Sequence, residues 1–223
     1  MTGRAKRIGD PARMGLATCL LLGGCAGGGL PARMTAAMDA AEAPRAVDWR
    51  KVATATDRSR LRGWRTAWMA ALSAVRADGK GAVIAADPAL YDPDRSLPDP
   101  VPPAGTYRCR TIKLGGQGPY GLTHVAYGWF ACRVSEEGAI DRLEKMTGSQ
   151  RMAGSLFEDT DARSVFLGTL ALGDERGGLA YGRDTQRDMA GFVERIGEKR
   201  WRLVLPYPHY ESTLDLLEIV AGP

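Results

Sequence analysis

Two short stretches of this 223-residue sequence repeat one polar pattern, a lysine followed a few residues later by a glutamine. The first stretch runs from Lys113 to Gln117, and the second contains Lys145, Gln150 and Arg151. Lysine and arginine donate hydrogen bonds to carboxylate and phosphate groups, whereas glutamine both donates and accepts. If both stretches end strands at one rim of a sheet, the five side chains converge on a site for a small polar or anionic ligand. The alternative is that both stretches are turns after strands, with the lysine side chains extending to solvent.

The sequence contains no recognisable catalytic motif. A hydrolytic triad of Ser149, His209 and Asp215 can be assembled on paper, but no serine lies in a G-x-S-x-G turn. The glycines of 116–121 fit G-x-G-x-x-G, yet a strand pattern follows them, so we interpret this stretch as a turn and not as a dinucleotide site. The two histidines lack metal-ligand spacing. We therefore expect no metal and no cofactor, and the sequence favours a binding or structural module over an enzyme.

Cys25 follows a short apolar segment in the layout of a secretory signal. Basic residues over 4–13 precede the apolar stretch Met14–Leu22, which is shorter than the about 20 residues needed to span a membrane. The sequence Leu-Gly-Gly-Cys at 22–25 resembles the bacterial lipoprotein signal. That resemblance implies removal of residues 1–24 and acylation of Cys25, with two or more acyl chains giving a stable anchor. A plain signal peptide cleaved elsewhere is the alternative.

The predicted cleavage also explains the high isoelectric point of about 9.0. The first 24 residues hold four of the 30 basic residues and one of the 26 acidic ones, so the remainder carries 26 basic against 25 acidic residues. The one dense basic run that is left, 58–65, is interpreted as a solvated helix face, and we expect no nucleic acid partner. Residue 26 is alanine, not the aspartate that retains lipoproteins at the inner membrane. We therefore expect an outer-membrane anchor, with the protein facing the periplasm.

Two cysteines, Cys109 and Cys132, are left once the signal is removed and Cys25 is acylated. An even pair in an oxidising compartment predicts a disulfide. Both lie in strand-like sequence, where Tyr107 shares a face with Cys109 and Val134 shares a face with Cys132. A bridge between two neighbouring antiparallel strands would contribute about 3 kcal/mol to stability in the chain-entropy model.

The remaining sequence divides into three segments. Residues 25–47 are rich in glycine, alanine and proline and are interpreted as a flexible tether. Residues 48–104 predict a helix from Thr54 or Thr56 to Asp78-Gly79, whose apolar stripe contains two tryptophans and is interpreted as its buried face. A short second helix over 82–91, interrupted by a proline, and a proline-rich connector complete this segment.

The third segment, 105–223, predicts an antiparallel β domain. Eight runs rich in β-branched and aromatic residues are separated by short turns. They cover about 106–114, 125–134, 139–147, 152–158, 163–172, 188–196, 199–205 and 213–221. The prediction is a mainly β fold with an N-terminal helical segment, in which a meander closes into a small lipocalin-like barrel because closure removes the sheet edges. An open twisted sheet or a sandwich is the alternative.

Six sequence phrases carry a family resemblance from about Trp49 to Ile219. They read DRSRLRGWRTAWMAAL, YRCRTIKLGGQG, EKMTGSQRMAG, SVFLGTLALGDE, YGRDTQRDMAGFVERIG and RWRLVLPYPHYESTLDLLEI. In order and spacing they are similar to an uncharacterised family of alphaproteobacterial envelope proteins, domain of unknown function 4893. The resemblance implies a single family domain that includes both helical and strand segments, and it brings no activity and no catalytic residues.

These patterns together predict a lipid-anchored, non-enzymatic envelope protein whose barrel binds a small ligand or an envelope partner. Two other classes stay open. A barrel-type protease inhibitor would insert the segment before the barrel into an active site, and a hydrolase would use Ser149 or a pair of carboxylates.

Overall fold

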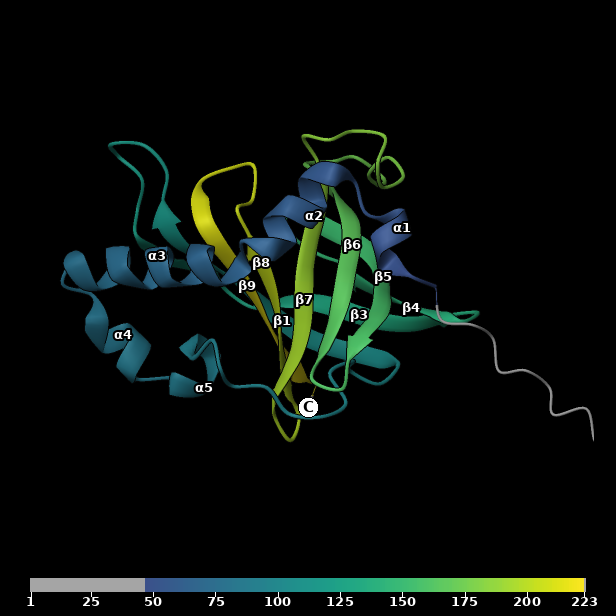
Figure 1. Cartoon of the computed structure of the whole chain (residues 1–223), viewed down its shortest axis with the longest axis horizontal. Coiled ribbons are helices and arrows are strands. Elements are labelled where there is room, and N and C mark those ends of the chain that lie inside the picture. Colours follow the sequence, from purple (N-terminus) through teal and green to yellow (C-terminus); the bar gives the residue numbers. More distant parts are fainter. Residues whose placement is uncertain (1–46, 223) are drawn as a thin grey trace, which may run out of the picture. The chain divides into compact units, whose positions relative to one another are not determined.

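The computed structural model describes residues 47–222, which form five short helices followed by nine strands (Figure 1). The helices are α1 (Trp49–Val52), α2 (Ala55–Arg62), α3 (Trp64–Ala77), α4 (Gly81–Ala85) and α5 (Pro88–Tyr91). The strands are β1 (Gly105–Gly116), β2 (His124–Ala126), β3 (Phe130–Glu137), β4 (Ile140–Lys145), β5 (Gln150–Thr160), β6 (Arg163–Leu172), β7 (Asp188–Gly197), β8 (Arg200–Pro206) and β9 (Ser212–Ala221).

The strands form a closed antiparallel barrel. Strands β3 to β9 pair in chain order, and β1 pairs with β3 on one side and with β9 on the other. The closing pair is long, running from Tyr107 opposite Ala221 to Gly116 opposite Ser212. Eight strands therefore form the barrel wall and β2 is an additional short strand, which confirms the predicted barrel and excludes the open sheet.

The predicted strand 125–134 is divided into β2 and β3. Both pieces pair with the same edge of β1, β2 with Ile112–Leu114 and β3 with Gly105–Cys109. Between them, the Trp129 ring lies beneath the guanidinium groups of Arg108 and Arg110, at 4.7 and 4.9 Å. The prediction of one continuous strand was thus wrong at the residues that join the two pieces.

The first predicted helix is also divided. Thr54 caps α2 by accepting a hydrogen bond from the backbone N–H of Asp57, as its position predicted. Gly63 then separates α2 from α3, and a Cβ at this position would lie 3.0 Å from the Tyr207 ring. Gly79 follows α3 with a φ of 71°, which is the predicted glycine stop.

The helices cover two areas of the outer barrel wall, so the protein has one core inside the barrel and two outside it. The buried stripe of α3, including Trp68 and Leu72, packs against Ile112 and Leu114 of β1 and against β8 and β9. Helices α1 and α2 pack on the outer faces of β5 to β7, where Phe157 is buried. This outer layer buries both faces of several strands, which explains their near-continuous burial.

The Cys109–Cys132 disulfide joins β1 to β3 inside the barrel, and both cysteines belong to the inner core. Their Cα atoms are 5.9 Å apart. Tyr107 and Val134 belong to the same core, which confirms that Tyr107 shares a face with Cys109 and that Val134 shares a face with Cys132.

Candidate functional site

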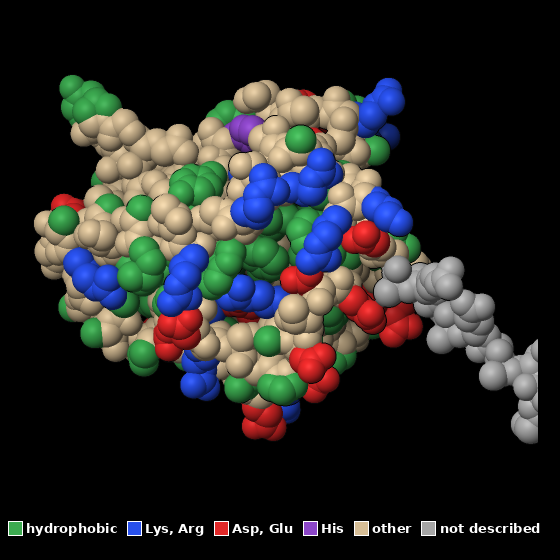
Figure 2. Space-filling model, in the orientation of Figure 1, with side chains coloured by type: hydrophobic (Ala, Val, Ile, Leu, Met, Phe, Trp, Pro, Cys, Tyr) green, Lys and Arg blue, Asp and Glu red, His purple; other side chains and the backbone are tan. Residues whose placement is uncertain are grey.

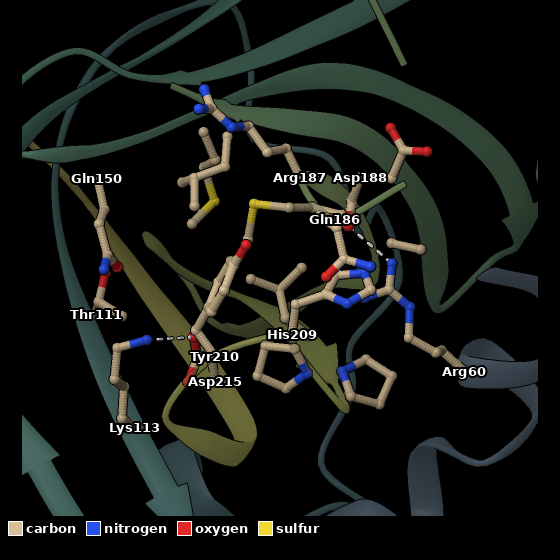
Figure 3. A pocket seen from close by; sticks show the side chains of 17 residues that line it. Arg60, Thr111, Lys113, Gln150, Gln186, Arg187, Asp188, His209, Tyr210 and Asp215 are labelled. Carbon is tan, nitrogen blue, oxygen red and sulfur yellow. Dashed lines mark hydrogen bonds and ion pairs between the residues drawn. The ribbon is translucent and has the colours of Figure 1, made fainter. Parts of the chain in front are cut away.

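A small cavity lies inside the rim at which β1 and β8 end and β5, β7 and β9 begin (Figure 3). Residues of the β8–β9 connection, Pro208 to Tyr210, and of the β6–β7 loop complete its lining. The volume open to the centres of water molecules is about 40 Å³, which holds only a few waters or a ligand of a few atoms. The polar residues around it are Arg60, Thr111, Lys113, Gln150, Gln186, Arg187, Asp188, His209, Tyr210 and Asp215.

A buried ion pair lies on one side of this cavity. The Lys113 Nζ is 3.0 Å from Asp215 Oδ2 and 3.1 Å from Glu211 Oε2. Burial alone would lower the pKa of Lys113, but the charges of Asp215 and Glu211 outweigh it and raise this pKa above its ordinary value. The Ser212 hydroxyl donates a hydrogen bond to the other oxygen of Asp215. The carboxylate is therefore held on both oxygens, and the lysine charge is already balanced.

His209 brings an unpartnered polar atom to the cavity lining. Its Nε2 is buried and has no hydrogen-bond partner within residues 47–222. Burial, followed by the nearby charge of Arg60, lowers the pKa of His209, so the neutral ring is the main form at neutral pH. A neutral imidazole has one donor and one acceptor nitrogen, and a buried ring nitrogen without a partner is costly.

Arg60 extends from α2 to the opposite side of the cavity (Figure 3). Its Nη2 donates a hydrogen bond to the backbone oxygen of Asp188 at 2.8 Å, and its Nε donates to Asp57 at 2.9 Å. Only 8% of Arg60 is exposed, so the interpretation of 58–65 as a solvated face was wrong at this residue. The three-residue spacing of Asp57 and Arg60 on a helix was the available signal for this pair.

Two of the five predicted ligand residues, Lys113 and Gln150, line the cavity. Gln117 instead holds the covering connection, because its amide donates to the backbone oxygens of Ser212 (2.6 Å) and Pro208 (3.3 Å).

Lys145 and Arg151 hold the turns of the same rim. Lys145 donates to the backbone oxygens of Gln150 (2.6 Å) and Thr147 (2.9 Å), and its Nζ lies 3.8 Å from the centre of the Phe130 ring. Burial, followed by the charge of Arg151, lowers the pKa of Lys145 to about 8. Arg151 donates to the backbone oxygens of Gly148 (2.9 Å) and Gly173 (2.6 Å). All five residues thus belong to one rim, but three of them bind backbone oxygens.

The residues proposed for a hydrolytic triad are not joined. Asp215 is bonded to Lys113 and Ser212, and no hydrogen bond among the described residues joins His209 to Ser149 or to Asp215. Asp215 was predicted only as a member of the triad. Strand alternation places it on the same face as Leu217 and Ile219 of the inner core, and this signal could have identified it as a cavity residue.

The fold and cavity define a class, that of small closed antiparallel barrels with a cavity at one rim and helices on the outer wall. The chain belongs to the family Domain of unknown function (DUF4893), whose profile matches residues 49–219. The match covers both the helices and the barrel, as the resemblance implied. No match was found among curated proteins or among solved structures.

None of the described helices has both the length and the apolar character needed to cross a bilayer. Within residues 47–222, no three or more His, Cys, Asp or Glu side chains are grouped to hold a metal ion.

Proposed function

We propose that the protein is a binding module that takes a small polar ligand into the rim cavity. The observation that carries the proposal is the buried, unpartnered Nε2 of His209 in a cavity that also contains the Lys113–Asp215 pair. A ligand with a hydrogen-bonding group would satisfy this nitrogen. The side-chain amide of Gln150, which has no hydrogen-bond partner among the described residues, offers a second contact.

The charge balance in the cavity favours a neutral or zwitterionic ligand over a simple anion. Asp215 and Glu211 offset the charge of Lys113, and Asp57 offsets that of Arg60. An anion would therefore gain little net Coulomb energy, whereas directed hydrogen bonds to lysine, glutamine and histidine would orient a polar molecule.

A ligand larger than a few atoms requires movement of the β8–β9 connection. Both ends of this connection have left-handed backbone, with φ of 48° at Tyr207 and 72° at Glu211. Such conformations are costly for residues other than glycine and concentrate at functional segments. They are consistent with a connection whose conformation changes when a ligand enters.

The cavity proposal is tested by thermal unfolding in the presence of small amino acids, sugars, simple anions and peptidoglycan fragments. We expect at least one neutral or zwitterionic compound to raise the midpoint of the wild-type protein, and His209→Phe to abolish the rise. His124→Phe is the matched control, because His124 is the other of the two histidines and bonds Tyr91 outside the cavity. If no compound stabilises the wild type, or if both variants respond alike, the cavity is not the binding site.

We also propose that acylated Cys25 anchors the protein to the outer membrane, facing the periplasm. Cys25 lies outside the described residues, and the proposal is supported by the sequence at 14–25. The disulfide is consistent with it, because such bonds persist in oxidising compartments.

The anchor is tested by labelling cells with palmitate and separating their membranes. We expect label in the outer-membrane fraction for the wild type and no label for Cys25→Ala. Absence of label from the wild type would refute the anchor while leaving the cavity proposal intact.

A further inference from the structure

A second hollow lies on the outside of the molecule, between α1, α2, the N-terminal end of α3 and the β5–β6 turn. It offers about 730 Å³ to the centres of water molecules, within the range typical of ligand sites. Its lining contains five arginines against two aspartates, together with three aromatic rings. These residues are Arg50, Arg58, Arg62, Arg65, Arg163, Asp94, Asp159, Trp49, Trp64 and Phe192. Figure 2 shows basic side chains gathered around hydrophobic ones over α1 and α2. We call this hollow the arginine groove.

Arg163 is fixed in place by two neighbours. Its Nε donates to Glu194 Oε1 at 2.6 Å, and its guanidinium carbon lies 3.8 Å from the centre of the Trp64 ring. Glu194 is fully buried and also pairs with Arg202. The Nη groups of Arg163 make no hydrogen bond within the described residues. Arg163 therefore provides a rigid guanidinium with free donors in the groove.

Two other arginines supply charge that no described carboxylate balances. Arg58 donates to the backbone oxygens of Arg50 and Ala53, and Arg62 is exposed without an acidic partner in residues 47–222. By contrast, Arg50 pairs with Asp159 at 3.0 Å, and Arg65 pairs with Asp94.

We propose that the arginine groove binds an oxyanion, phosphate or carboxylate, that is attached to a group with an apolar face, such as a sugar ring or the glyceride of a phospholipid. Guanidinium groups bind such oxyanions through paired N–H donors, and Arg163 is already oriented for this contact. The half-buried Trp64 and the buried Phe192, which both line the groove, provide an apolar wall for the attached group. This chemistry is shared by free sugar phosphates and by the headgroups of anionic phospholipids. The proposal does not depend on the rim cavity.

The test measures binding of three probes to the mature protein: inorganic phosphate, glucose 1-phosphate, and phosphatidylcholine vesicles with and without phosphatidylglycerol. We expect saturable binding of glucose 1-phosphate or of the phosphatidylglycerol vesicles, and weaker binding of inorganic phosphate. Arg58→Gln combined with Arg62→Gln removes the two charges that no described carboxylate balances, and it should raise the dissociation constant at least roughly tenfold because charge-assisted hydrogen bonds are lost.

Arg76→Gln combined with Arg183→Gln is the matched control, since it removes the same charge from exposed positions outside the groove. Arg163→Lys keeps a charge beside Glu194 but loses the paired donors, and it should also weaken binding. If the control variant loses binding to the same extent, overall charge explains the effect and the proposal is overturned. Absence of saturable binding to all of the probes would also overturn it. Vesicle binding without glucose 1-phosphate binding would assign the groove to a lipid headgroup, and the reverse result would assign it to a free sugar phosphate.

Discussion

Lys113 and Asp215 face each other inside the barrel with almost no exposure to solvent, at 7% and 6% of their side chains. Removing one partner of such a pair leaves the other charge buried and unbalanced, whereas replacing both with apolar groups is often tolerated. Lys113 and Asp215 therefore depend on each other, and neither residue can be replaced alone without a loss of stability.

We expect Lys113→Met to lower the free energy of unfolding by about 3–5 kcal/mol. The double variant Lys113→Met/Asp215→Leu should recover most of that loss. Urea denaturation of both variants measures the effect. Arg133→Met is the control, because its pair with Glu144 is half exposed on the arginine side and should contribute under about 1 kcal/mol. Equal losses in the buried and exposed variants would contradict the assignment.

The lowered pKa of Lys145 predicts that the stability of the protein depends on pH. Its pKa of about 8 in the folded protein lies below the ordinary value of 10.5. Between these pH values the unfolded chain retains a proton that the folded protein has lost, so stability rises with pH. The wild type should therefore gain stability relative to Lys145→Met by up to about 1.4 kcal/mol per pH unit from pH 8 to 10. Urea denaturation at pH 7, 8, 9 and 10 tests this, and a constant difference would contradict it.

Sequence alone predicted which way a side chain points where strand alternation applies. It missed contacts in which the partner lies far along the chain. The inward side of Lys113 follows from its spacing to Cys109, but the Asp215 that neutralises it is about a hundred positions away. Burial of Arg60 likewise depends on β7, which approaches α2 only in the folded protein. Local periodicity contains no information on such contacts.

At the scale of elements, the disulfide joins the two strands that its sequence context predicted. The bridge closes a loop of 23 residues between β1 and β3. Replacing both cysteines with alanine should lower the free energy of unfolding by about 3 kcal/mol. Urea denaturation measures the loss, and thiol titration of the unfolded, unreduced mature wild type should find no free thiol. Two free thiols, or an unchanged stability, would refute the stabilising bridge.

Two glycines allow close approach of β5 and β6. Gly154 and Gly168 lie opposite each other, and a Cβ on Gly168 would lie 2.5 Å from the backbone oxygen of Ala153. We expect Gly168→Ala to destabilise the protein by about 1–3 kcal/mol. Gly177→Ala, where nothing lies within 4 Å, should change stability by less than about 0.5 kcal/mol. Thermal and urea unfolding compare the two, and similar effects would exclude steric crowding as the cause.

The ends of the helices were also predictable only where the signal is local in the sequence. Capping by Thr54 and the stop at Gly79 were predictable because their signals are local. The close approach of the Tyr207 ring to Gly63 was not predictable, because Tyr207 lies far along the chain in the β8–β9 connection. An isolated glycine inside a periodic helix pattern is not by itself a break.

At the scale of the whole molecule, the helical segment shares buried surface with the outer wall of the barrel. The fully buried Arg202 of β8 pairs with Glu194 and donates to the backbone oxygens of Leu90 and Arg95. Trp68 of α3 is buried completely against the outer wall. Residues 48–104 and 105–223 thus share buried surface, although they differ in composition.

Expression of residues 105–223 alone should therefore give an unstable or aggregated product. The outer faces of β1 and β9 would expose apolar side chains that α3 covers in the intact protein, including Ile112, Leu114 and Leu216. A chain of residues 47–223 is the comparison, and size-exclusion chromatography with circular dichroism distinguishes the two. A monomeric, cooperatively unfolding 105–223 would show that the barrel is stable without its helices.

The closing pair of β1 and β9 also sets the order in which the protein can fold. The hairpins from β3 to β9 join neighbours in sequence and can form as soon as each is available. The closing pair joins residues separated by about a hundred positions, so its loop-closure entropy is large and its formation late. Until then both margins of the sheet present unpaired backbone groups, as edge strands do. Barrel closure is therefore expected to be the slow step of folding. Before this step, the unclosed sheet is most open to pairing with another chain.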